Sequence, residues 1–274
     1  MLELIKNKNL LFGIILVAPF ILFSLFPTTF ATHKPNKTSI KNLYSPPNIK
    51  NLFGTDELGR DIYSRIIHGS RSTIFSSLLI IFVASIFGSI LGLIAGFYGG
   101  MKEKIILIFV DLVLSFPSLV LALVVSASLG PGLKSAIIAS ASVWWPVYAR
   151  LMHGLTLKIK KLPFIEAAKV MGFSDLRILI KHIMPNCLSS LIVRMSLDIG
   201  LAILLLTSLS FVGLGASAPN PEWGSMVAWG RLYLLTEWWI GGFPTIVISI
   251  VVIGVMLIGD GLNDLFNIHL RNIE

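Results

Sequence analysis

Charged residues are scarce in this sequence of 274 residues, at 13% against about 25% in an ordinary soluble domain. Hydrophobic residues make up 55% of the chain, and the mean hydropathy is +0.84. One aqueous core cannot hide that much apolar surface, so lipid must be the solvent for much of the molecule. The composition therefore excludes a soluble enzyme and predicts an integral membrane protein.

Cysteine is nearly absent, since Cys187 is the only one in the chain. A single cysteine excludes an internal disulfide and any cysteine-based zinc or iron–sulfur cluster. The five histidines are dispersed without metal-binding spacing, and no glycine-rich nucleotide loop with Lys and Ser/Thr occurs. We therefore expect no metal and no cofactor on this chain.

The net charge of +8 raises the question of nucleic acid as a partner. The basic residues, however, are scattered over the segments that connect apolar runs. This placement is typical of membrane orientation, so we expect a lipid bilayer and no nucleic acid.

Six stretches are long and apolar enough, or nearly so, to cross a membrane, which takes about 20 residues. They predict an all-α membrane protein with six transmembrane helices, at 10–26, 74–97, 105–129, 133–148, 191–212 and 238–258. The first could instead be a signal peptide cut near Ala31, but the cleavage site is poor and we favour an uncleaved anchor. The fourth is short, and Pro146 is expected near its end.

An even number of spans places both termini on the same side of the membrane. If both are cytoplasmic, slightly more Lys and Arg residues lie inside than outside, as the positive-inside rule requires. We expect an N-terminal part, 1–73, with the anchor helix and an extracytoplasmic loop. The rest, 74–274, is expected to be a core of five helices with a cytoplasmic loop at about 150–190.

The extracytoplasmic loop contains a candidate amphipathic helix. Asp56 can cap its N-terminus and Gly69 can end it. Leu58, Ile62 and Ile66 would form its apolar face, which predicts a short helix lying at the membrane surface. The opposite face would be polar and carry Arg60, Asp61, Ser64 and Arg65.

Three glycines, Gly88, Gly92 and Gly96, follow one another at four-residue spacing in the second predicted span. The spacing places three positions without side chains on one helix face, where another helix can approach closely. We interpret this ladder as a packing surface within the subunit.

Few charges lie at membrane depth, where they usually indicate transport or proton relay. Asp111 lies in the third predicted span, and Arg194 and Asp198 lie four residues apart in the fifth. The spacing lets Arg194 and Asp198 neutralise each other. We interpret them as a structural pair, with an ion or substrate site as the alternative.

Between the fourth and fifth spans the apolar runs stop and two short helices are predicted. Pro163 suits the first position of one helix, and Gly172 suits a left-handed residue at its end. Ser174 can cap a second helix, which Pro185 is expected to end. The predicted product is a cytoplasmic projection whose tip exposes Glu166, Ala167 and Ala168.

The same segment contains an ordered series of residues: Glu166, Ala167, Ala168, Gly172, Ile183, Met184 and Pro185. This series resembles the EAA loop of importer-type ABC transporter permeases, with Met184 in place of the usual leucine. His182 stands where many members have isoleucine, which matches the peptide branch. Residues 54–61, 211–215, 221–224 and 259–264 are similar to segments of the second permease of dipeptide, oligopeptide and nickel importers.

The resemblance implies the type I ABC importer permease fold in a bacterial inner membrane. It implies a homologous second permease, two ATPase subunits that hold ATP and Mg, and an extracytoplasmic substrate-binding protein. This chain would catalyse nothing. Its ATPase-coupling residues would be Glu166, Ala167, Ala168, Gly172 and Pro185.

Two other classes remain as alternatives. An ion-coupled secondary transporter would use Asp111 or the Arg194 and Asp198 pair. An assembly factor or intramembrane enzyme would need a Ser/His, His/Glu or paired-carboxylate arrangement, and none is visible in the spans. The substrate, peptide or nickel, is left open because both branches share these motifs.

Overall fold

The computed structural model describes the backbone of residues 7–271 and the side chains of residues 7–265. Every regular element in this part of the chain is a helix, and one isolated bridge joins Thr55 to Asp61. In chain order the helices are α2 (Lys8–Leu25), α3 (Pro27–Phe30), η1 (Ile40–Asn42), α4 (Ile62–Tyr98), α5 (Gly100–Leu114), α6 (Ser118–Leu129), α7 (Leu133–Ile159), α8 (Pro163–Val170), α9 (Asp175–Ile178), η2 (Leu179–Ile183), α10 (Met184–Phe211), α11 (Trp223–Gly230), η3 (Arg231–Tyr233) and α12 (Trp239–Arg271).

Four membrane-spanning candidates are long and apolar enough by themselves: α2, α4, α12 and the stretch from α9 through α10. The α5–α6 pair makes a fifth candidate, but the chain bends by 92° between these two helices. The third predicted span is therefore not one straight helix. Pro117 accounts for the break, because proline disfavours helical backbone at the residue before it and donates no hydrogen bond.

The fourth predicted span forms part of α7, which continues through Pro146 as far as Ile159. The expectation that Pro146 lies near the helix end is wrong. Pro146 is buried, and neighbouring helices allow a proline inside a membrane helix. α7 is less apolar than the other long helices because it carries Lys134, Arg150 and Lys158, yet it packs along α4 within the same bundle.

The predicted surface helix in the outer loop is also wrong. Residues 54–61 form turns, and α4 begins at Ile62, where Asp61 rather than Asp56 is the N-cap. Gly69 does not end a helix, because α4 continues through it to Tyr98. A Cβ at Gly69 would lie 3.0 Å from Cδ1 of Trp223, so the glycine allows α11 to approach. The face expected to be polar and exposed is buried, including Arg60, Asp61, Ser64 and Arg65.

The glycine ladder is confirmed as a packing surface between α4 and α7. A Cβ at Gly88 would lie 2.2 Å from the carbonyl oxygen of Trp145, and one at Gly92 would lie 2.3 Å from that of Ala149. At Gly96 the nearest atom would be Cβ of Thr156, at 2.7 Å. The two helix backbones therefore approach as closely as glycine permits.

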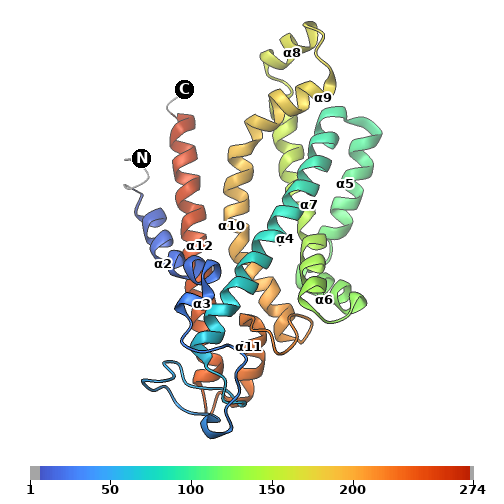
Figure 1. Cartoon of the computed structure of the whole chain (residues 1–274). Helices are drawn as coiled ribbons and strands as arrows, with labels where there is room; N and C mark the ends of the chain where they lie inside the picture. The colour runs from blue at the N-terminus through green and yellow to red at the C-terminus, as the bar shows by residue number, and fades with distance from the viewer. Residues whose placement is uncertain (1–6, 272–274) are drawn as a thin grey trace.

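The first helix belongs to the bundle. A Cβ at Gly13 of α2 would lie 2.6 Å from the carbonyl oxygen of Gly254 of α12, and Val17 packs into the core beside α12. Figure 1 shows α8 and α9 beyond one end of the bundle, with the ends of the described chain toward that end and residues 31–61 with α11 at the other.

Candidate functional site

The link between α7 and α10 projects from the bundle as a helix, a turn and a second short helix. α8 begins with Pro163 as its first residue, as predicted. Ser174, whose backbone is extended, immediately precedes α9. Figure 1 shows both helices beyond the ends of their neighbours.

Gly172 makes the reversal between the two helices. Its φ of +76° is left-handed, as predicted. The amide of Phe173 donates to the carbonyl of Ala168 at 3.1 Å, and the amide of Gly172 donates to that of Lys169 at 2.9 Å. These two bonds form the Schellman motif, which satisfies carbonyls at the end of α8. The chain direction at the tip is thus fixed by one glycine.

The predicted tip residues divide into two sets. Glu166 and Ala167 are exposed, but Ala168 is buried, so the expectation that all three are exposed is wrong. Ala168 faces inward together with Ile165 and Ile178, and all three belong to the larger of the two apolar cores of the bundle. Because residues three apart on a helix share a face, Ile165 and Ala168 pack while Glu166 stays outside.

Three apolar side chains at the tip are exposed and were missed by the sequence reading. Val170 is 89% exposed, Met171 64% and Leu176 65%. They surround the turn at Gly172, at the far end of the projection. Exposed apolar side chains at the end of a projection form a candidate surface for another protein.

An aromatic stack stiffens the projection. The guanidinium of Arg177 lies 4.0 Å from the ring centroid of Phe173, and the ring of His182 is stacked on Phe173 at 5.7 Å between centroids. Such cation–π and stacked contacts each stabilise a fold by about 0.5 to 1.5 kcal/mol. The stack joins the turn to η2 at the base of α10.

The base of the projection is tied to the end of α4. The Lys160 ammonium donates to the carbonyl of Phe97 at 2.7 Å and to that of Gly96 at 3.2 Å. These carbonyls lie in the last turn of α4, where unpaired acceptors and the helix dipole favour a cation. A displacement of the projection therefore reaches α4 directly.

Pro185 does not end the second helix, contrary to the prediction. It lies in the first turn of α10, and the helix runs on from α9 through the π-helical turn η2. A proline cannot donate to the carbonyl four residues back, and its ring clashes with that carbonyl in a regular helix. The π turn at Leu179–Ile183 widens the spiral just before Pro185 and removes this conflict.

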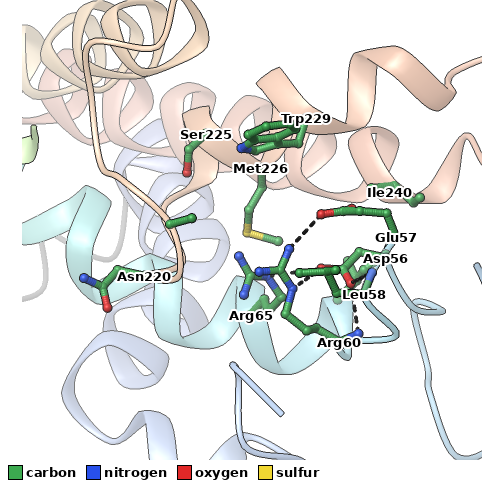
Figure 2. A pocket seen from close by; sticks show the side chains of 12 residues that line it. Asp56, Glu57, Leu58, Arg60, Arg65, Asn220, Ser225, Met226, Trp229 and Ile240 are labelled. Carbon is green, nitrogen blue, oxygen red and sulfur yellow. Dashed lines mark hydrogen bonds and ion pairs between the residues drawn. The ribbon is translucent and has the colours of Figure 1, made fainter. Parts of the chain in front are cut away.

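A polar recess of about 190 Å³ lies at the opposite end of the bundle, between residues 56–65 and α11. The Asp56 carboxylate accepts a hydrogen bond from Nε of Arg60 at 2.7 Å, and Nε of Arg65 lies 3.7 Å from the same oxygen. Figure 2 shows these three side chains meeting beneath Met226 and Trp229. Their paired charges fasten the outer segment to α4, so the motif at 54–61 has a structural role.

Glu222, in the segment 221–224 beside this recess, has a structural role that the sequence analysis did not single out. Its side chain caps α11 by accepting hydrogen bonds from the amides of Gly224 and Ser225, both at 2.9 Å. The Thr73 hydroxyl of α4 donates to it at 3.2 Å. A carboxylate just before a short helix was the available signal.

Replacing Glu222 should reveal this cap. Burial raises the pKa of Glu222, so its neutral form is favoured on folding. That contribution to stability is present below the ordinary pKa and is lost as pH rises through the raised value. Glu222→Gln should keep the fold and abolish this pH dependence of the unfolding temperature. Glu222→Leu leaves the donors of the cap without an acceptor and should lower the free energy of unfolding by about 1 to 3 kcal/mol. An unchanged pH dependence in Glu222→Gln would contradict this.

The charges at membrane depth are paired. Arg194 Nε donates to Asp198 Oδ2 at 2.9 Å, which confirms the predicted pair. Asp111 forms an ion pair with Arg150 of α7, and both side chains are largely exposed. Neither site gathers the several acidic ligands that an ion-coupled carrier would use, and no group of three His, Cys, Asp or Glu residues in the described chain could hold a metal ion.

The described chain is thus a bundle of apolar helices, several of them long enough to cross a membrane, with one short helical projection. Residues 88–272 match the family described as binding-protein-dependent transport system inner membrane component. The chain belongs to this family.

Curated relatives agree with the family. The chain is 42% identical to the "Probable D,D-dipeptide transport system permease protein DdpC" of Escherichia coli (strain K12), over 92% of this chain and 85% of that protein. It is 40% identical to the dipeptide transport system permease protein DppC of Alkalihalophilus pseudofirmus, over 96% of this chain and 86% of that protein.

A solved structure shares the fold. The inward-facing MetNI methionine ABC transporter contains a chain that is 20% identical to this one, with a TM-score of 0.50 over 68% of this chain and 91% of that chain. This likeness confirms the predicted fold class, an all-α membrane protein with the type I ABC importer permease fold. The secondary-transporter alternative is not supported.

Proposed function

We propose that this chain is one of two homologous permease subunits of an ATP-driven importer, and that it forms half of a translocation pathway for peptides. The relatives named for D,D-dipeptides and dipeptides support the substrate class. The observation that carries the coupling role is the exposed apolar tip, Val170, Met171 and Leu176, on a projection joined to α4 through Lys160.

In this proposal the tip docks on a cytoplasmic ATPase. Two ATPase subunits hold ATP and Mg and do the hydrolysis, and this chain has no catalytic residue. Closure of the ATPase dimer pushes the projection, and the contacts of Lys160 with Gly96 and Phe97 pass that movement to α4. The substrate-binding protein delivers peptide at the opposite end, where residues 31–61 and α11 lie.

The substrate proposal is tested by uptake into proteoliposomes that contain the complete transporter. Dipeptides, longer peptides and Ni²⁺ should be offered separately with the loaded binding protein, and ATP hydrolysis recorded alongside. Peptide uptake without Ni²⁺ uptake is the expected result. Uptake of Ni²⁺ with no peptide uptake would overturn the substrate assignment and keep the permease role.

The orientation in a bacterial inner membrane, with both termini cytoplasmic, is tested by cysteine labelling. Cys187 is buried and can be replaced by serine. In that background Ile49→Cys, at a side chain 97% exposed, should react with an impermeant maleimide applied to intact cells, whereas Val170→Cys should react only after permeabilisation. Labelling of Val170→Cys in intact cells would reverse the orientation.

A further inference from the structure

α10 packs against five other helices of the bundle, α4, α6, α7, α11 and α12. Exposed residues occur on two faces of α10: Leu188 and Ile192 lie on one, and a second stripe lies on the opposite face. Its exposed residues are spaced by three, four or seven positions, which places them on one helix face: Ser190, Arg194, Leu201 and Leu204. This stripe therefore faces something outside the subunit.

Arg194 is the charged residue on the stripe, and it is held from one side only. Its side chain is 44% exposed, while that of Asp198 is 1% exposed. The bond from Nε to Asp198 Oδ2 fixes the plane of the guanidinium. Among the described residues the two terminal nitrogens have no other hydrogen-bond partner, which leaves four N–H donors unpaired.

A lipid-facing stripe does not fit this arrangement. A guanidinium in contact with hydrocarbon costs at least about 2.5 kcal/mol, and such residues face protein or a water-filled cavity instead. Asp198 is fixed by burial within α10, near Tyr148 of α7. The pair thus presents a partly exposed cation, supported by a buried carboxylate, on a face that the described chain leaves uncovered.

We propose that Arg194 binds the terminal carboxylate of the peptide during its passage, with Asp198 as a positioning residue. The inference rests on the proposed function and deepens it. A guanidinium with two free terminal nitrogens offers parallel N–H bonds that fit a carboxylate. The neighbouring Asp198 charge offsets part of the attraction, which keeps binding weak enough for release, as a translocation pathway requires.

The test measures binding without the substrate-binding protein, which could itself select the peptide. A radiolabelled dipeptide is bound to the detergent-purified permease and ATPase complex, and is displaced by the free acid or by the C-terminal amide of the same peptide. For the unaltered complex we expect the acid to compete at least about tenfold better than the amide, equivalent to about 1.4 kcal/mol.

The double variant Arg194→Gln, Asp198→Asn removes both charges, so neither is left buried alone and assembly should persist on co-purification. The double variant should lose the preference for the acid. Arg194→Lys should keep only part of it, because lysine lacks the paired nitrogens with which a guanidinium binds both oxygens of a carboxylate. Equal competition by acid and amide in the unaltered complex, or full preference in the double variant, would overturn the role of Arg194. Failure of the proposed function would appear separately, as absence of peptide uptake by the complete unaltered transporter.

Discussion

A chain with Gly172→Val and Glu166→Lys is expected to insert in the membrane and to retain its partner permease while it loses its ATPase. Valine is poorly tolerated at a φ of +76°, at a cost of about 1 to 2 kcal/mol. Since no atom lies within 4 Å of a Cβ at Gly172, backbone conformation and not space is the obstacle. Lysine at 166 reverses the exposed charge offered to the partner.

The measurement is ATPase retention on affinity purification, with hydrolysis stimulated by the loaded binding protein. We expect both to fall at least about tenfold, since tenfold corresponds to only 1.4 kcal/mol. Gly172→Asn is the matched control, because asparagine adopts the left-handed conformation readily and should keep most of the coupling. Normal ATPase retention and normal stimulation of hydrolysis in the double variant would contradict the assignment of Glu166 and Gly172 as ATPase-coupling residues.

Gly92→Ala is expected to disrupt the bundle itself. The added methyl would lie 2.3 Å from the carbonyl oxygen of Ala149 and 2.8 Å from Cβ of Met152. These positions belong to the backbone and to a first side-chain carbon of α7, so the helices must separate. Overpacking of this kind costs about 1 to 3 kcal/mol or more.

Gly154→Ala in α7 makes the same chemical change where nothing lies within 4 Å, and a better helix former should be neutral or stabilising there. The yield of monodisperse protein and its unfolding temperature should therefore fall for Gly92→Ala alone. Equal behaviour of the two variants would show that the α4–α7 contact is not as close as described.

The prolines show which part of the fold the sequence could predict. Apolar length located the helices, because membrane insertion depends on local composition. The effect of a proline depends on its neighbours: Pro117 breaks the third span, Pro146 lies inside α7, and Pro185 follows a π turn. Gly69 was misread for the same reason, since its partner Trp223 is far away in the sequence.

In the candidate site, too, local features were predicted from the sequence and features that depend on distant residues were not. The left-handed turn at Gly172 and the start of α8 at Pro163 are local features, and both were predicted. The burial of Ala168 depends on the apolar core that it shares with Ile165 and Ile178, which spacing alone does not reveal. The exposure of Val170 and Met171 could not be foreseen either, because apolar residues in a helical pattern usually indicate a core.

Cross-linking from the tip tests the central claim most directly. In a Cys187→Ser chain assembled with its partners, Val170→Cys carries a photoreactive maleimide, and Leu235→Cys serves as the control. Both parent side chains are almost fully exposed, at 89% and 101%. Leu235, however, shortly precedes the start of α12, and α12 begins at the end of the bundle opposite α8. We expect an adduct with the ATPase from residue 170 and none from residue 235. An intact complex with no ATPase adduct from residue 170, or with one from residue 235, would contradict that claim.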